Sequence, residues 1–430
     1  MANDKKDEPV MKQRCSFCKR EVEIHDSLDM PIYDPATGFG ICKNCIKELA
    51  HYIELHEEDT AKKQAPDFAA QLDEILKKNK PHIIKQYLDE YIINQDRAKK
   101  ILSVAVYNHY KRMKYGYTND DGTEIEKSNV IMLGPSGCGK TALLSHLSKL
   151  LDVPFAVTDA SSLTEAGFVG ADVEVAVRNL YYAADKDIQK AEHGIIYLDE
   201  FDKIARKSGA NNSITADPGH EGVQQALLKM LEGNVVEFTA RGQRKHPEAP
   251  TIKVDTKNIL FICGGAFDGI ERKIAQRLNT HVVGYNSVQN VKKIDKKDMM
   301  KYILPQDLKS FGLIPEIIGR LPVLTYLNPL DKEALRSILV EPKNSIVKQY
   351  QKLFEIDGIK LEFEDGVFDF IVDKAMEYKL GARGLRSIVE SVMMDAMFDV
   401  PSENVKEFTV TLDYAKSQLD KAHLQKLETD

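Results

Sequence analysis

The stretch Gly134 to Thr141, GPSGCGKT, decides the fold of this 430-residue chain. It has the form G-x-x-x-x-G-K-T and lies between an apolar run at 129–133 (NVIML) and a helix-compatible run at 142–151 (ALLSHLSKLL). A strand, a glycine-rich loop and a helix in this order predict a phosphate-binding loop, because the glycines let backbone N–H groups face phosphate oxygens at the positive end of a helix. The alternative is a glycine-rich turn that binds nothing.

The residue types inside this loop have separate predicted roles. Lys140 is expected to contact the β- and γ-phosphates, and the hydroxyl of Thr141 is expected to bind Mg²⁺. The loop therefore predicts a site for a nucleoside triphosphate with Mg²⁺. The other predicted contacts of the loop come from Gly134, Pro135, Ser136, Gly137, Cys138 and Gly139.

A second apolar run, 195–198 (IIYL), ends in Asp199 and Glu200. Since parallel strands present their carboxyl ends at one edge of a sheet, both carboxylates are predicted to lie beside the phosphate loop. Asp199 would bind Mg²⁺ together with Thr141, and Glu200 would polarise a water for attack on the γ-phosphate. Taken without the loop, an apolar run that ends in two carboxylates is also typical of an ordinary surface strand end.

Strand-like and helix-like patterns alternate after the loop, with further predicted strands at 153–158 and 258–263. This alternation predicts an α/β fold with a mostly parallel sheet covered by helices. Beyond Pro322 the pattern changes to helices with charged faces, which predicts a smaller, mainly α second domain. Its predicted helices are 331–340, 345–354, 365–378 and 383–398, with two strand-like runs at 359–363 and 408–412.

The chain is too long for a single core, so several domains are expected. A polar, charged stretch after residue 51 predicts a linker, and a helical pattern begins at Pro81 and continues to Tyr110. The predicted division is an amino-terminal module at 1–51, a linker at 52–80, a large α/β domain at 81–321, a small helical domain at 322–420 and a tail at 421–430.

Composition excludes several classes of function. The chain is 43% hydrophobic and 29% charged, and it has no apolar run near the roughly 18 residues that a membrane span needs. The amino terminus is too charged for a secretory signal, so we expect a cytoplasmic protein with no membrane association. The net charge of −7 argues against a main role in binding nucleic acid, because that role usually needs a basic surface.

Two C-x-x-C pairs, Cys15 with Cys18 and Cys42 with Cys45, lie near the amino terminus. Four thiolates at such spacing predict a tetrahedral Zn²⁺ site with a β-hairpin between the pairs. All four ligand positions are filled by cysteine, so the metal is expected to be structural, and the module is expected to bind partners. The alternatives are a redox C-x-x-C motif and a disulfide.

Longer motifs follow one another along the chain: LDEFDKIARK, EGVQQALLKMLEG, RKHP, FICGGAF, FGLIPEIIGRLPV and GARGLRSIVE. With the phosphate loop and the four-cysteine module, they closely resemble the ClpX family, the ATP-dependent unfoldases of the AAA+ superfamily that act with the ClpP peptidase. The resemblance covers nearly the whole chain. It implies a P-loop AAA+ module with a small helical domain and a zinc-binding amino-terminal module, assembled as a homohexamer.

The resemblance also implies roles for two arginines. Arg320, in IIGRLPV, matches the arginine finger that reaches the nucleotide of a neighbouring subunit. Arg383, in GARG, matches the second-domain arginine that senses the γ-phosphate. From spacing alone, each arginine would be interpreted as a surface charge or an ion pair.

Three further segments match substrate-binding and partner-binding positions of the family. Phe168 and Val169, between two glycines, resemble the pore loop that grips the substrate chain, with Phe in place of the usual Tyr. The alternative for Phe168 is a ring that packs the loop on the core. The basic residues Arg244, Lys245 and His246 resemble the loop at the pore entrance, or else form a solvated basic turn. Val283, Gly284 and Tyr285 are the expected equivalent of the peptidase-docking Ile-Gly-Phe tripeptide.

The chain departs from the family pattern at two other places. The segment near the adenine has Ile93 and Gln95 within Ile-Ile-Asn-Gln instead of Val-Ile-Gly-Gln, and both residues are expected to contact nucleotide. The strand at 258–263 ends in Cys-Gly-Gly and lacks the Asn or Thr that many AAA+ proteins use as a first sensor. Cys138 and Cys263 are interpreted as small buried residues rather than redox sensors.

The resulting prediction is an ATPase that unfolds tagged or adaptor-delivered proteins and threads them through a hexameric pore into a ClpP-type peptidase, with adaptors bound by the zinc module. It has no peptidase activity of its own. Three alternatives remain: a clamp-loader or helicase-loader type ATPase with the zinc module as a nucleic-acid finger, an adaptor whose ATPase only switches state, and the related unfoldase HslU. The zinc module and the lack of a large inserted domain disfavour HslU.

Overall fold

The computed structural model describes residues 11–24, 32–34, 37–50, 68–116, 123–164, 171–205, 218–239, 251–280, 298–378, 381–403 and 405–427. The chain divides into two compact units, Met1–Leu72 and Asp73–Asp430. Across the ranges given above, no helix combines the length and the apolar character that a membrane crossing needs.

The first unit contains two small hairpins. Strands β1 (Met11–Arg14) and β2 (Glu21–Ile24) pair antiparallel, as do β3 (Ile32–Asp34) and β4 (Phe39–Ile41), and residues 43–50 form a helix. The predicted hairpin between the cysteine pairs is therefore confirmed by β3 and β4. Its buried cluster consists of three cysteines with Cys18, Val22 and Ile41 packed on it, which is too few apolar side chains for an independent core.

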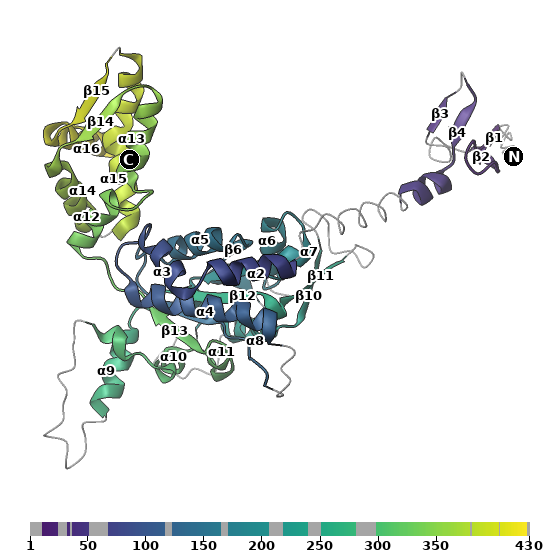
Figure 1. Ribbon diagram of the computed structural model, residues 1–430, viewed down its shortest axis with the longest axis horizontal. Helices are drawn as coiled ribbons and strands as arrows, with labels where there is room; N and C mark the ends of the chain where they lie inside the picture. The colour runs from purple at the N-terminus through teal and green to yellow at the C-terminus, as the bar shows by residue number, and fades with distance from the viewer. Residues whose placement is uncertain are drawn as a thin grey trace, which may run out of the picture. The chain divides into compact units, whose positions relative to one another are not determined.

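The second unit is built on a five-stranded sheet in the order β13-β5-β12-β9-β6, in which all neighbouring strands are parallel. The predicted parallel sheet is confirmed. Helix α4 packs on β13 and β5, while α6 packs on β6 and β9 (Figure 1). Buried on both faces, β5 and β12 are continuous apolar runs rather than alternating ones. The bounds are β5 Val130–Leu133, β6 Phe155–Asp159, β9 Ile195–Asp199, β12 Leu260–Gly265, β13 Val323–Tyr326, α4 Asp96–Tyr115 and α6 Val175–Ala183.

Other elements of this unit surround the sheet or project from it (Figure 1). Helix α2 spans the boundary between the two units and lies within the stretch in which the sequence predicts only a linker. Its residues Leu72, Ile75 and Leu76 are buried. The helices are α2 Phe68–Lys78, α3 Pro81–Asp89, α5 Lys140–Leu151, α7 Ile188–Ala191, α8 Pro218–Glu232, α9 Ile270–Thr280, α10 Pro305–Phe311 and α11 Pro315–Gly319. The short strands are β7 Leu163–Thr164, β8 Ala171–Asp172, β10 Val235–Thr239 and β11 Thr251–Asp255. The 3₁₀ turns are η1 Ala160–Ser162, η2 Phe201–Ile204, η3 Thr256–Asn258 and η4 Met299–Tyr302.

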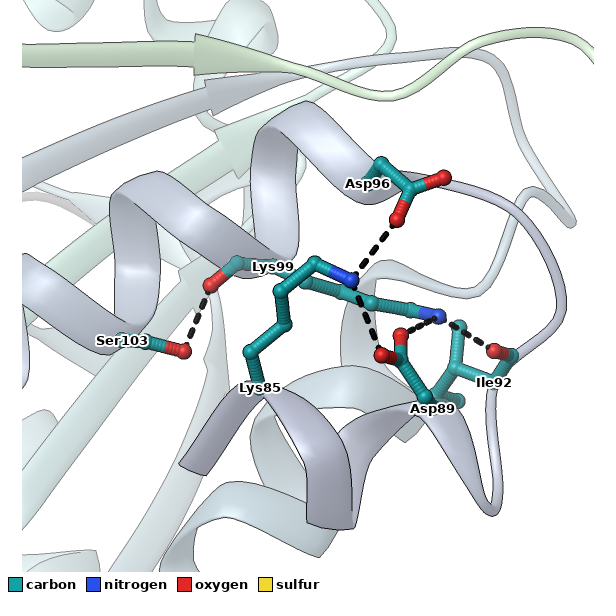
Figure 2. Close-up of polar contacts among 6 residues, drawn as sticks. All are labelled: Lys85, Asp89, Ile92, Asp96, Lys99 and Ser103. Atoms are coloured by element: carbon teal, nitrogen blue, oxygen red, sulfur yellow. Dashed lines mark hydrogen bonds and ion pairs between the residues drawn. The ribbon is translucent and has the colours of Figure 1, made fainter. Parts of the chain in front are cut away.

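The helical pattern that begins at Pro81 is divided by a corner between α3 and α4, which Figure 2 shows in detail. Lys99 is only 2% exposed, and its Nζ donates to Asp89 Oδ1 at 2.7 Å and to the Ile92 carbonyl at 2.6 Å. Lys85 pairs with Asp89 and Asp96 at 2.8 Å each. Burial raises the pKa of Asp89, but the hydrogen bonds from Lys85 and Lys99 outweigh it and leave the pKa below its usual value. The buried ammonium of Lys99 thus donates to two acceptors, and these bonds stabilise the corner.

A group of helices, α12 to α16, forms the carboxyl-terminal part of the second unit around its own apolar cluster (Figure 1). Asp331 and Ser345 begin two of these helices by accepting from backbone N–H groups. The predicted mainly helical second domain is confirmed, and the predicted boundary at 321/322 lies just before β13. The bounds are α12 Lys332–Val340, α13 Ile346–Ile356, α14 Asp365–Glu377, α15 Gly381–Asp399, η5 Val400–Ser402 and α16 Leu412–Leu427, with β14 Lys360–Phe363 parallel to β15 Glu407–Val410.

Candidate functional site

The phosphate loop connects β5 to α5 in the predicted order. Gly137 and Gly139 have φ angles of 77° and 99°, which side chains rarely adopt, so the loop depends on glycine at both places. Lys140 is the first residue of α5 and is largely buried. Its ammonium donates to the carbonyls of Gly134 at 2.6 Å and Pro135 at 3.0 Å. These bonds hold the Lys140 ammonium against the loop. In this position it is expected to contact phosphate together with the loop.

The end of β9 brings the two predicted carboxylates to the same place. Thr141 Oγ1 donates to Asp199 Oδ2 at 3.4 Å, so the two expected Mg²⁺ ligands are neighbours. Oxygen atoms of this kind suit a hard cation, and the pair therefore fits Mg²⁺. Glu200 is exposed and has a φ angle of 53°, a conformation that is uncommon outside glycine and that clusters at functional sites.

A cavity of about 560 Å³ lies over these groups, within the size range typical of small-ligand sites. It brings together Lys140 and Thr141 from the start of α5, Asp199 and Glu200 from the end of β9, and Arg383 from α15. The described residues that line it are Ser136, Gly137, Gly139, Lys140, Thr141, Ala142, Asp199, Glu200, Asp202, Lys203, Ala266, Asp268, Ile346, Ala382, Arg383 and Arg386.

Sequence reasoning missed several lining residues, of which Arg386 is the most informative. It lies three residues after Arg383 on α15, the spacing that places two side chains on one helix face. Arg386 Nη2 donates to Gln349 Oε1 at 2.6 Å, and Gln349 Nε2 donates to the Asn344 carbonyl at 2.9 Å. The motif GARGLR contained this signal, since its second arginine follows the first by one turn.

Arg320 is absent from the described lining of the cavity. Its side chain is 54% exposed and its Nη2 pairs with Glu232 Oε1, at the end of α8, at 2.9 Å. A hydrogen bond holds the Arg320 backbone, because the buried Asn129 donates to the Arg320 carbonyl at 3.0 Å. The Arg320 backbone is thus tied to the buried Asn129, while its side chain is partly exposed and paired with Glu232.

Gln95 and Ile93 also lie outside the cavity lining in the described part of the chain. Gln95 is buried, and its amide both donates to the Asn328 carbonyl at 2.9 Å and accepts from the Asn328 N–H at 2.8 Å. Asn94 and Gln95 have φ angles of 56° and 63°. The side chain of Gln95 therefore ties the α3–α4 corner to the segment that follows β13.

The four amino-terminal cysteines form a compact cluster in which all Sγ atoms lie within 4.8 Å of one another. Cys15 Sγ and Cys45 Sγ are 3.9 Å apart, as are those of Cys18 and Cys42. Four sulfurs at about 2.3 Å from a tetrahedral metal lie roughly 3.8 Å from one another, so the cluster fits zinc. In the described ranges, this is the only place where three or more His, Cys, Asp or Glu side chains lie close enough to share a metal ion.

The pKa values of Cys15 and Cys45 also bear on the binding of a metal ion. Burial opposes the Cys15 thiolate, but backbone N–H groups, first that of Cys42, outweigh burial and lower the pKa of Cys15 to about 6. Burial and the neighbouring thiols raise the pKa of Cys45 to about 12. A bound cation would favour the thiolate form of Cys45, since thiolates and not thiols bind metal.

Cys138 and Cys263 are both buried, and burial raises the pKa of each thiol. This agrees with their interpretation as small buried residues, since the thiolate is the reactive form. The predicted substrate and docking segments lie outside the described residues; these are Phe168 and Val169, then Arg244, Lys245 and His246, then Val283, Gly284 and Tyr285.

A phosphate loop between a buried strand and a helix, an acidic pair at the end of a neighbouring parallel strand, and a helical domain that contributes arginines define a P-loop ATPase of the AAA+ class. Residues 125–324 match the family model of the AAA domain (Cdc48 subfamily), and residues 330–411 match that of the C-terminal, D2-small domain, of ClpB protein.

Curated relatives give the family. The chain is 59% identical to the ATP-dependent Clp protease ATP-binding subunit ClpX of Bacteroides thetaiotaomicron over 97% of this chain and 98% of the relative. It is 58% identical to the same subunit of Bacteroides fragilis, with the same coverage. It is 60% identical to that of Porphyromonas gingivalis over 79% of this chain and 82% of the relative. The chain belongs to the ClpX family.

Proposed function

We propose that this chain is an ATP-dependent protein unfoldase and translocase that threads tagged or adaptor-delivered proteins into a ClpP-type peptidase. The observation that carries the proposal is the cavity in which Lys140, Thr141, Asp199 and Glu200 meet Arg383. The relatives that match almost the whole chain are named as ATP-binding subunits of the Clp protease. They do not favour the clamp-loader or helicase-loader alternative.

In the proposed ATP site, each residue has a role that depends on its position. Lys140 and backbone N–H groups within residues 136–139 would bind the phosphates, and Thr141 and Asp199 would hold Mg²⁺. Bound Mg²⁺ supplies charge that offsets the phosphate oxygens. Glu200, exposed to the cavity, orients and deprotonates the attacking water, and Arg383 binds the γ-phosphate from the helical domain.

We further propose that the chain forms a homohexameric ring, which the position of Arg320 supports. Its side chain is absent from the described lining of its own cavity and pairs with Glu232 on the surface, and we infer that it acts on the nucleotide of a neighbouring subunit. Arginine fingers of this kind accelerate hydrolysis about 10³- to 10⁵-fold. Ile93 and Gln95 are proposed to shape the adenine end of the site.

The remaining roles follow the family. Phe168 and Val169 grip the substrate chain, and the basic segment 244–246 meets it at the pore entrance. The segment 283–285 docks the peptidase, and adaptors bind the amino-terminal module. We place the protein in the cytoplasm, with modules at 1–51, 81–321 and 322–420 joined by the linker 52–80 and followed by the tail 421–430.

We assign Zn²⁺ to the cysteine cluster. The spacing of the four sulfurs supports zinc, and all four ligand positions are taken by Cys15, Cys18, Cys42 and Cys45. With no position left for substrate, the metal is structural. It stabilises a module that has almost no apolar core.

The test is loss of fluorescence from a stably folded reporter that carries a recognition tag. Full-length protein with Mg-ATP is expected to unfold the reporter, and addition of ClpP is expected to degrade it. The control is Glu200→Gln, which should bind ATP without unfolding the reporter. Rapid ATP hydrolysis with no loss of reporter fluorescence would instead indicate an ATPase that only switches state.

A further inference from the structure

The ends of the neighbouring strands β9 and β12 pack closely against each other beside the ATP site. Strand β12 ends in Gly264 and Gly265, where the sequence lacks a polar sensor residue. A Cβ atom on Gly264 would lie 2.3 Å from the hydroxyl oxygen of Tyr197 and 2.6 and 2.8 Å from two of its ring carbons. The tyrosine of β9 therefore occupies the space into which a side chain at position 264 would point.

Tyr197 is fully buried, and its hydroxyl has a defined partner. It donates to Asp199 Oδ1 at 2.9 Å, and the same oxygen accepts the Glu200 N–H at 2.9 Å. The other oxygen, Oδ2, is the one that accepts from Thr141 Oγ1 at 3.4 Å. Two donors on Oδ1 leave Oδ2 as the oxygen that faces the proposed metal position.

A tyrosine hydroxyl has a single proton, and Tyr197 donates it to Asp199 Oδ1. An isolated carboxylate rotates about its Cβ–Cγ bond with little resistance, because that torsion is broad. Two hydrogen bonds to one oxygen remove this freedom.

We propose that Tyr197 is a positioning residue that fixes the rotation of the Asp199 carboxylate so that Oδ2 is presented to Mg²⁺ beside Thr141, and that Gly264 is required at the end of β12 to make room for the tyrosine. The proposal deepens the proposed ATPase function and rests on it. Hydrogen bonds to metal-binding carboxylates typically change metal affinity or activity by about 10- to 100-fold when they are removed.

The test is the affinity of a non-hydrolysable fluorescent ATP analogue for the full-length chain, with and without added Mg²⁺. Tyr197→Phe removes only the hydroxyl, and it should reduce the Mg²⁺-dependent gain in affinity about tenfold or more while metal-free affinity changes less than about twofold. Tyr110→Phe is the matched control, because Tyr110 is equally buried and its hydroxyl contacts only a carbonyl, that of His193. It should change neither affinity.

A double-mutant cycle tests whether Tyr197 acts through Asp199. In an Asp199→Asn background, Tyr197→Phe should cause no further loss of Mg²⁺-dependent affinity. Gly264→Ala should reproduce the loss of Tyr197→Phe because its methyl group displaces the hydroxyl, and it decides the question if Tyr197→Phe does not fold.

Two results of the affinity assay on Tyr197→Phe alone would overturn the proposal: an unchanged Mg²⁺-dependent affinity in the folded variant, or an equal loss with and without Mg²⁺. An additive loss in the Asp199→Asn background would also overturn it. The assay is separate from unfolding, so a chain that binds Mg-nucleotide as expected but does not unfold the reporter contradicts the proposed function and leaves the role of Tyr197 intact.

Discussion

The cysteine cluster and the ATP cavity are both built from side chains that converge on a ligand, but they are held in place differently. The cluster draws its four ligands from residues 15–45 and is buried against only a few apolar side chains. The cavity draws its groups from residues 136–386 and lies on a sheet with a large apolar core. The cysteine cluster therefore depends on bound metal to keep its structure, whereas the fold alone positions the side chains of the ATP cavity.

The two sites also differ in completeness. Every ligand of the cluster lies within one chain, in a space of 4.8 Å. The cavity contains the phosphate, metal and water-directed groups, while Arg320 lies elsewhere and pairs with Glu232. We therefore expect that metal alone completes the cluster and that a second subunit completes the ATP site.

The largest expected effect is on the cluster. Replacing Cys15 and Cys18 together with Ser should abolish zinc binding and unfold the amino-terminal module, because structural zinc contributes on the order of 10 kcal/mol to such modules. Measured zinc content should fall to zero, and residues 11–50 should become sensitive to limited proteolysis. The basal ATPase rate should change less than about twofold, since the cavity rests on a separate core.

The control for this change is Lys43→Ala, which alters an exposed residue between two ligands. It should keep its zinc and its resistance to proteolysis. Loss of nucleotide binding in the Cys15 and Cys18 variant would contradict the independence of the two sites.

The next largest effect is expected at Arg320. Arg320→Ala should lower the turnover of ATP about 10³- to 10⁵-fold, equivalent to roughly 4 to 7 kcal/mol of transition-state stabilisation. Nucleotide binding should stay nearly unchanged, as the residue lies outside the cavity lining. Steady-state hydrolysis and equilibrium nucleotide binding are the measurements. A normal rate in this variant would show that the chain completes its own site.

Glu200→Gln should cause a smaller but still large loss. It removes the base and keeps the size of the side chain, so hydrolysis should fall about 10²- to 10⁴-fold while ATP binding and assembly persist. Single-turnover hydrolysis measures the chemical step directly. Asp268→Asn, another acidic residue of the cavity lining, is the matched control, and a comparable loss there would remove Glu200 from its special role.

Acid should weaken the large domain through His109. Burial, with Arg112 and Lys127 nearby, lowers the pKa of His109 from 6.5 to about 3. The unfolded chain therefore binds a proton that the folded chain rejects, and stability should be lost as pH falls from about 6.5 towards 3, by at most about 1.4 kcal/mol per pH unit. His109→Gln should flatten this dependence in thermal unfolding. An unchanged pH profile in that variant would exclude His109 as the cause.

The smallest effect is expected at Glu232, which pairs with Arg320 on the surface. Exposed ion pairs contribute about 0 to 1 kcal/mol, so Glu232→Gln should release Arg320 and change the ATPase rate less than about fivefold. Glu237→Gln, which breaks the exposed pair with Lys253, is the control. A loss as large as that of Arg320→Ala would mean that Glu232 belongs to the working site.

Local motifs made both sites predictable in part. Paired cysteines and the phosphate loop are short segments whose chemistry depends on neighbours in the sequence, so Lys140, Thr141 and the four cysteine ligands could be named from the sequence. Asp199 and Glu200 could be added because the end of a buried strand fixes their place at the sheet edge.

Contacts between distant segments could not be predicted in the same way. Tyr197 lies in an apolar run, and only the register of β9 beside β12 brings its hydroxyl against Gly264. The sequence pattern continues as helical through Asn94 and Gln95, where the structure has a turn. Hydrogen bonds of Lys99 with Asp89 and of Asn328 with Gln95 stabilise this turn. Helix α2 was not predicted, because it lies in a stretch of mostly polar and charged residues and buries only a few apolar side chains.

The most direct test of the difference between the two sites is the ATPase activity of rings that contain both Glu200→Gln and Arg320→Ala subunits. Each variant alone should be nearly inactive. In co-expressed mixed rings, an Arg320→Ala subunit keeps its own Glu200 and receives Arg320 from a Glu200→Gln neighbour, so about a quarter of the sites should recover in an equal mixture. Activity no greater than that of the separate variants would contradict an ATP site completed by a second subunit.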